Sequence, residues 1–199
     1  MSIYTTLGPI LRTYPKLRVL RGYDPTRPTT LQKSLPVQSG VTIYSGQVIS
    51  QAWNSGLTRF EWVLGGSGTQ PTFFANGDSG DPDIISADSL PALPSYGQFV
   101  LQTGYFDAGT YNTGTPLTFS TGTPGNVAVG SYGTSSAAGV PIIGYADGVE
   151  GSSNSAIVNL GAPSHAGYAA FAPYDSSATD LSVLQLVTAW IPVNPKAAA

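Results

Sequence analysis

The chain contains no cysteine, a single histidine and few charged side chains. The lack of cysteine excludes disulfides, thiolate-ligated zinc and thiol catalysis. Lysine, arginine, aspartate and glutamate make up 10% of the 199 residues, compared with about 25% in typical globular domains. Glycine, proline, serine and threonine take their place. A surface so low in charge is more typical of a subunit packed in an assembly than of a freely diffusing enzyme.

Long apolar runs are also absent. The longest, near residues 181–191, is too short to cross a bilayer as a helix. The first 20 residues contain no apolar stretch of the kind that a secretory signal peptide needs. We therefore expect a soluble protein that is made in the cytoplasm and has no membrane partner.

The few charges are divided unevenly along the chain. Six of the eight basic residues lie in the first 33 residues beside one acid, Asp24, whereas the remainder has two bases against ten acids. A basic arm on an acidic body is expected to dock on a negative surface, such as a neighbouring subunit, a viral shell or nucleic acid; the alternative is a solvated tail. The candidate interaction residues are the bases of this segment and a tyrosine between them: Arg12, Lys16, Arg18, Arg21, Tyr23, Arg27 and Lys33.

Proline and glycine divide the chain into an arm and a body. Five prolines in residues 1–36 disfavour helices and central strands, so we predict an extended arm that becomes ordered on binding. Residues 37–199 contain short β-rich runs flanked by glycine, proline or asparagine. This pattern predicts an all-β body, a small barrel or sandwich of short antiparallel strands. We expect a loop at 65–97, with a possible subdivision of the body near residue 95.

Alternation within single runs predicts which side chains face the core. The run RFEWVLG from Arg59 predicts a strand with Trp62 inward and Glu61 outward. The run from Leu181 to Val193 fits either a helical stripe or a buried strand, and the all-β context favours the strand. In the glycine- and threonine-rich middle of the chain, we expect four side chains to point inward: Leu117, Phe119, Val127 and Val129.

No set of residues in the sequence predicts catalysis. His165 lies between Ser164 and Ala166, and the chain has no G-x-S-x-G nucleophile motif. The only two glutamates are Glu61 and Glu150, and nothing in the sequence brings them together as a glycosidase pair. We therefore expect no enzymatic activity and no cofactor.

An acidic loop and two tyrosines offer weak binding signals. The loop NGDSGDPDIISAD has carboxylates suited to calcium but not the spacing of an EF-hand, and aspartate and glycine also favour turns, so we expect no metal. Tyr14 and Tyr23 lie among the bases of the arm and are compatible with base stacking. No recognition fold accompanies them, so no direct nucleic-acid partner is expected. The carboxylates of the loop are Asp78, Asp81, Asp83 and Asp88.

A pattern of small residues, tyrosines and short apolar pairs covers about residues 38–193. Its main piece is the segment YGQFVLQTGYFDAGTYNTGTPLTFSTGTPGNVAVGS from Tyr96, followed by GVPIIGYADG, and its outer pieces are SGQVIS and LQLVTAWIP. This pattern resembles the head decoration, or capsid cement, proteins of tailed bacteriophages. The positions that match the family pattern are Thr103, Tyr105, Phe106, Asp107, Tyr111, Gly114, Leu117, Thr118, Gly125, Asn126, Val127, Ile142, Ile143 and Gly144.

The resemblance implies a non-enzymatic, β-rich virion protein. Such a subunit would bind the major capsid protein on the outside of an icosahedral shell, often as a homotrimer, and stabilise the shell against internal DNA pressure. The basic segment from Leu11 to Lys33 would reach the shell or a neighbouring copy.

Two other classes of non-enzymatic protein fit the composition. One is a different virion part, such as a tail or fibre subunit, although fibres usually show repeats or coiled coils and this chain shows neither. The other is a carbohydrate-binding β module that uses Tyr44, Trp53 and Trp62, although Trp62 is expected in the core.

Overall fold

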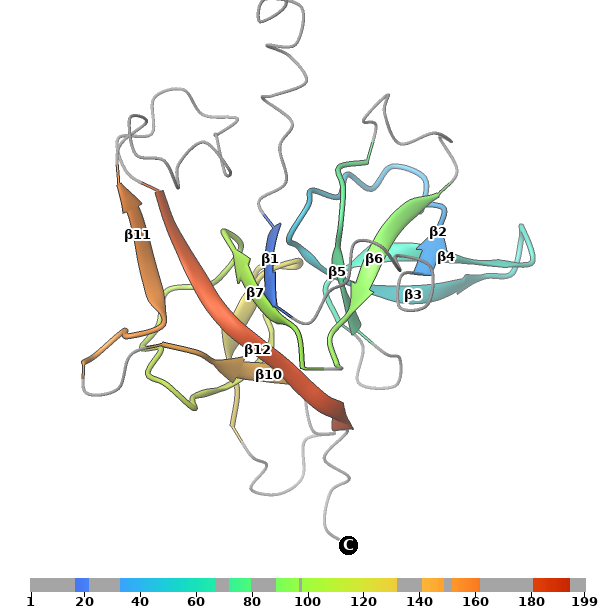
Figure 1. Ribbon diagram of the computed structural model, residues 1–199. Helices are drawn as coiled ribbons and strands as arrows, with labels where there is room; N and C mark the ends of the chain where they lie inside the picture. The colour runs from blue at the N-terminus through green and yellow to red at the C-terminus, as the bar shows by residue number, and fades with distance from the viewer. Residues whose placement is uncertain are drawn as a thin grey trace, which may run out of the picture.

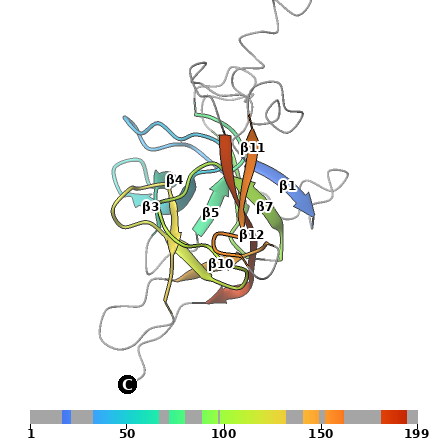
Figure 2. The same ribbon diagram turned by 90° about the vertical axis from the view of Figure 1, so that its left-hand side faces the viewer.

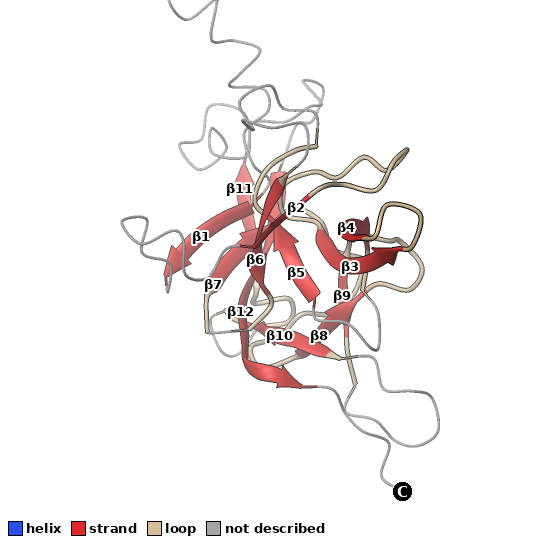
Figure 3. Cartoon of the chain, turned by 90° about the vertical axis from the view of Figure 1, so that its right-hand side faces the viewer, coloured by secondary structure: helices blue, strands red, loops and turns tan. Residues whose placement is uncertain are grey.

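A computed structural model describes residues 17–21, 33–66, 72–79, 89–96, 98–131, 141–148, 152–161 and 181–193. These residues form twelve β-strands in two sheets, and all strand pairs are antiparallel (Figure 1). The described part of the chain contains no helix, and so none that could span a membrane (Figure 3). The prediction of an all-β body of short antiparallel strands is confirmed.

The larger sheet has seven strands in the order β1-β7-β12-β10-β8-β9, with β11 also paired to β12. Figure 2 shows β11 beside β12, where it pairs with the first residues of that strand, Leu181 to Leu184. The strands are β1 (Leu17–Arg21), β7 (Val100–Thr103), β8 (Pro116–Phe119), β9 (Val127–Val129), β10 (Ile142–Ala146), β11 (Ile157–Gly161) and β12 (Leu181–Val193).

The smaller sheet has five strands in the order β2-β6-β5-β3-β4. Its two edges are therefore β2 and β4, and β4 is reached from β3 through a short hairpin loop. The strands are β2 (Lys33–Leu35), β3 (Val48–Asn54), β4 (Arg59–Leu64), β5 (Thr72–Ala75) and β6 (Leu90–Pro94).

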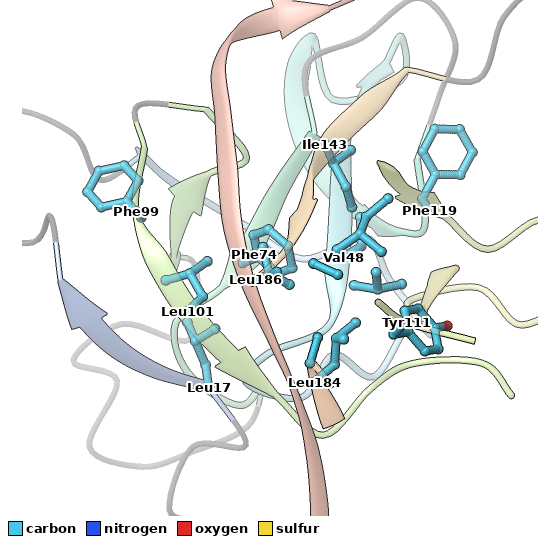
Figure 4. Close-up of a cluster of buried hydrophobic side chains, with 14 of the residues drawn as sticks. Leu17, Val48, Phe74, Phe99, Leu101, Tyr111, Phe119, Ile143, Leu184 and Leu186 are labelled. Atoms are coloured by element: carbon cyan, nitrogen blue, oxygen red, sulfur yellow. The ribbon is translucent and has the colours of Figure 1, made fainter. Parts of the chain in front are cut away.

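The two sheets pack on each other through one hydrophobic cluster. Val48 and Phe74 from the smaller sheet lie in this cluster with Leu101, Ile143 and Leu184 from the larger one (Figure 4). Burial of apolar surface between two sheets is the main stabilising term of such a sandwich. The core thus lies between the sheets and fixes their relative position.

A second cluster covers the other face of the smaller sheet. Ile49, Trp62 and Phe73 are buried there, and Val37 and Val41, from the loop that precedes β3, pack against them. The indole Nε1 of Trp62 donates a hydrogen bond to the carbonyl oxygen of Leu90 at 2.8 Å. The predicted inward orientation of Trp62 is confirmed, and both faces of this sheet are covered near its centre.

The run from Leu181 to Val193, which fitted either a helix or a buried strand, forms the strand β12, so the predicted strand is confirmed. β12 has three neighbouring strands. It pairs with β7 along one side and with β10 and β11 along the other. Val183 and Leu184 are both fully buried although they point to opposite faces of the sheet. Burial on both faces explains why the run has no polar alternation.

The region 65–97, predicted as loop, contains two strands, β5 and β6, and that prediction is wrong. Prolines at both ends of β6 caused the error, because proline cannot donate to a sheet ladder. In the strand register Pro91 lies opposite a residue of β2 and Pro94 opposite a residue of β5, and the two ladders overlap at Ala92 alone. Just past the end of β5, the carbonyl oxygen of Pro91 also accepts a hydrogen bond from the backbone N–H of Asn76 at 2.8 Å.

The described parts of the basic segment 1–36 are edge strands of the two sheets. β1 pairs with β7, and Leu17 at its start is buried in the shared core. β2 pairs with β6. These parts are extended, as predicted, and they complete the sheets. The rest of the segment lies outside the described residues.

Three of the four side chains expected to point inward are buried. Leu117, Phe119 and Val127 lie in the core, whereas Val129 is 46% exposed. Val129 ends β9, the three-residue edge strand of the larger sheet, and therefore lies past the margin of the core although it shares a face with Val127.

Four of the residues that match the family pattern, Phe106, Asp107, Tyr111 and Asn126, contact one another. The hydroxyl of Tyr111 donates to the carbonyl of Asp107 at 2.8 Å, and Asn126 Nδ2 donates to Asp107 Oδ1 at 2.9 Å. The ring of Phe106 packs edge-on against Tyr111 with centroids 5.8 Å apart. The backbone N–H of Asp107 donates to Val127 at 2.8 Å. These motif residues thus hold a loop onto β9.

Candidate interaction surface

The β3–β4 hairpin presents exposed apolar side chains at its end. Figure 1 shows this hairpin reaching outward at the right of the molecule, past the other strands of its sheet. Trp53 is 56% exposed, Leu57 55% and Phe60 40%. Trp53 and Leu57 are the most exposed large apolar side chains among the described residues. We call the three residues Trp53, Leu57 and Phe60 the aromatic tip.

The two rings of the aromatic tip support each other across the hairpin. Trp53 and Phe60 are directly opposite in the strand register, and their ring centroids lie 5.1 Å apart at an interplanar angle of 68°. Such edge-to-face pairs between facing strands are favourable. By the alternation along β4, Phe60 shares a face with buried Trp62. The tip is therefore the exposed continuation of a core face.

The opposite face of the hairpin is held by a polar network around Glu61. The Arg59 Nη2 atom lies 2.9 Å from Glu61 Oε1, and Arg59 Nε donates to the same oxygen at 3.0 Å. Asn54 Nδ2 donates to Glu61 Oε2 at 2.9 Å. The side chain of Glu61 is 2% exposed and that of Arg59 is 44% exposed. Both carboxylate oxygens are thereby paired.

The prediction that Glu61 faces solvent is wrong. The side chain does lie on the face opposite Trp62, but Arg59 and Asn54, which flank it on the two strands, cover it. The hydrogen bond from Asn54, assisted by Arg59, lowers the pKa of Glu61 below its ordinary value, although burial acts in the opposite direction. Glu61 therefore stays ionised, and its carboxylate holds Asn54 and Arg59 in place on the hairpin.

The loop of the hairpin is fixed by the same asparagine. Asn54 Oδ1 accepts hydrogen bonds from the backbone N–H groups of Gly56 at 3.0 Å and Leu57 at 3.1 Å. Thr58 closes the loop in the left-handed region with a φ of 49°. Asparagine side chains favour such turns because they replace a backbone acceptor. Leu57 is thus held at the end of a braced loop.

Three of the seven candidate interaction residues of the basic segment lie in described strands. Arg18 and Arg21 belong to β1, opposite Gln102 and Val100, and their side chains are not described. Lys33 lies in β2, where its exposed side chain donates to Gln51 Oε1 at 2.9 Å. The remaining candidates lie outside the described residues: Arg12, Lys16, Tyr23 and Arg27.

The residues considered for catalysis and metal binding form no cluster within the described ranges. No group of three metal-binding side chains occurs there. Asp78 is buried and accepts a hydrogen bond from the backbone N–H of Ser45 at 2.6 Å, so it organises a loop. The other carboxylates considered, and the histidine, lie outside the described residues: Asp81, Asp83, Asp88, Glu150 and His165.

The three aromatic residues considered for sugar binding do not form a shared exposed platform. Trp62 is fully buried. Tyr44 stacks on Tyr105, with ring centroids 6.5 Å apart and an interplanar angle of 9°. Burial, together with the charges of Asp78 and Tyr44, raises the pKa of Tyr105, so that this phenol stays neutral. Of the three, Trp53 is the one that belongs to the aromatic tip.

The sequence analysis did not predict that Leu57 and Phe60 form an exposed surface, or that Asn54 supports it. The signal was present: the turn segment NSGLT separates two alternating runs, which indicates a hairpin with facing aromatic residues.

Comparison of the chain with protein-family models, curated proteins and solved structures gives no significant match, so no family is assigned to it.

Proposed function

We propose that this chain is a non-enzymatic structural protein of a bacteriophage virion, which binds the outer surface of the capsid and stabilises the shell. Its partners in this role are the major capsid protein and further copies of itself, as a homotrimer. The proposal joins two lines of support: the resemblance of residues 38–193 to capsid decoration proteins, and the surface of the β3–β4 hairpin.

The observation that carries the proposal is the aromatic tip on its braced hairpin. Large apolar side chains are costly to leave in water, and aromatic residues are enriched at the centres of protein interfaces. Here the exposed side chains of Trp53 and Leu57 stand on a hairpin in which the side chains of Asn54, Arg59 and Glu61 are already paired with one another. A surface of this kind is suited to binding another protein.

Binding to the assembled shell is sufficient to stabilise it, and no catalytic step is needed. A protein that binds the assembled shell but not its separated subunits stabilises the shell by mass action. Three weak contacts per trimer, repeated by the symmetry of the shell, give high total affinity. The basic residues of segment 1–36 add attraction to a negative surface, which weakens as salt increases.

Co-sedimentation with shells tests the proposal. The full-length chain is mixed with expanded, DNA-free shells assembled from the major capsid protein of its own virus, and the mass of the free protein is measured by light scattering. We expect a discrete trimer that sediments with shells at saturable stoichiometry and raises their melting temperature. A chain that stays in the supernatant at every salt concentration overturns the proposal and favours a tail or sugar-binding role.

A further inference from the structure

The aromatic tip has the properties of an anchor for an apolar protein pocket. We propose, resting on the function proposed above, that Trp53 and Leu57 insert into an apolar pocket on the outer face of the major capsid protein. The partner is therefore a repeated protein surface. Side chains of the hairpin make the apolar contact, to which the basic residues of the segment 1–36 add charge attraction.

The charge of the hairpin favours an uncharged pocket. The loop residues 55–58 carry no charged side chain. Arg59 and Glu61, which follow in β4, neutralise each other in an ion pair at 2.9 Å. Moving this tip from water into a protein pocket therefore removes apolar surface without stripping water from an unpaired charge. A phosphate or another anionic ligand gains little from such a tip.

The shape of the tip disfavours a sugar ligand. Trp53 and Phe60 pack edge-to-face at an interplanar angle of 68°, which gives a ridge rather than a flat platform for a sugar ring. The polar side chains of Asn54 and Glu61 lie on the opposite face of the hairpin, where they are bonded to each other, to Arg59 and to the loop backbone.

The hairpin is also preorganised for insertion. Ordering flexible side chains and loops on binding opposes association. Here the loop is already fixed by Asn54, and the indole of Trp53 already packs against Phe60. The cost of ordering is therefore low at the residues that contact the pocket.

The area of the tip favours a shell over a simple pair of chains. Large aromatic side chains offer about 150–250 Å² each, and about half of each tip side chain is exposed. The three together can bury on the order of 300 Å², whereas a stable interface needs about 800 Å² from each partner. A dimer held by this tip alone would be weak. On a shell, several tips of one trimer bind at once, and avidity compensates.

Substitution of the tip, with a matched control elsewhere, tests the inference. The double variant Trp53→Ser/Leu57→Ser removes the exposed apolar side chains. The control Val129→Ser removes an exposed apolar side chain from β9 in the other sheet. Both variants are checked for an unchanged trimer mass and melting temperature, and binding to expanded shells is then measured by co-sedimentation. We expect the tip variant to bind at least 10-fold more weakly and the control to bind like the unmodified protein.

A photo-crosslinker identifies what the tip touches. The variant Leu57→p-benzoylphenylalanine is bound to shells and irradiated, and crosslinked peptides are identified by mass spectrometry. We expect peptides of the major capsid protein. Crosslinks to another copy of this chain, or equal shell binding by the tip variant and the control, overturn this inference and leave the proposed function standing. If the unmodified protein binds no shells, the proposed function fails, and the inference fails with it.

Discussion

At the scale of single residues, Glu61 shows how a buried carboxylate can organise an exposed surface. Its two oxygens hold Asn54 on one strand and Arg59 on its own strand, while Asn54 holds the loop. Trp53 and Phe60 stand on the opposite face of the same hairpin. The geometry of the aromatic tip therefore depends on polar residues that do not contact the partner.

The lowered pKa of Glu61 predicts an acid-sensitive hairpin. Because this pKa is lower in the folded protein than the ordinary value of 4.5, the ionised carboxylate stabilises the fold fully above about pH 4.5. The contribution is lost as the pH falls through the lower, folded-state pKa. Thermal unfolding of the unmodified protein and of Glu61→Gln, followed from pH 7 to pH 3, should show a difference in melting temperature that shrinks with acidification. A difference that is constant with pH contradicts this role.

Single side chains were also the least predictable feature. Alternation along β4 gave the correct face for Trp62, but burial of Glu61 depends on Asn54, which the hairpin brings to it from β3. Val129 has the same alternation as Val127 and differs only because the core ends before it. The alternation along one strand predicts the face to which a side chain points. It does not predict whether a residue of the neighbouring strand covers that side chain.

At the scale of elements, the strands that were predictable are those whose ends are marked by glycine or proline. β7, β8, β9 and β10 lie in short apolar runs with such borders. β5 and β6 were missed because proline inside β6 normally indicates a loop. The β-sheet accommodates these prolines because the two ladders of β6 are offset, and this offset is a property of three strands that are distant in sequence.

Gly144 tests how closely β10 and β12 are packed. A Cβ atom at this position would lie 2.5 Å from the carbonyl oxygen of Val187, so Gly144→Ala must move one of the two strands. We expect a loss of about 1–3 kcal/mol in unfolding free energy. Gly122→Ala is the control, because its nearest neighbour, Ser120 Oγ, would be 3.9 Å away. Equal denaturation midpoints for the two variants would contradict the packing described.

At the scale of the whole molecule, the described strands of the segment 1–36 are part of the sandwich. β1 completes one edge of the larger sheet and β2 one edge of the smaller sheet, and Leu17 lies in the core that the two sheets share. Composition separated this segment from the body because its prolines and bases differ from the rest. The pairing partners, β7 and β6, lie far along the chain, and composition contains no information about them.

Removal of residues 1–36 should therefore destabilise the body. Loss of a buried leucine side chain alone typically costs about 2–5 kcal/mol, and the unpaired edges of β6 and β7 add to this. We expect a chain that begins at residue 37 to unfold at a clearly lower denaturant concentration than the full chain. A chain that begins at residue 12, which keeps β1 and β2, is the control. Equal midpoints for all three chains would show that β1 and β2 do not stabilise the fold.

An electron cryomicroscopy reconstruction of expanded shells incubated with the full-length chain, compared with shells alone, tests most directly whether the chain binds the outside of the capsid. We expect additional density on the outer surface, repeated at symmetry-related three-fold positions, with the β3–β4 hairpin pointing into the capsid subunits. A reconstruction without additional density on the shell, or with density at the tail vertex alone, would contradict it.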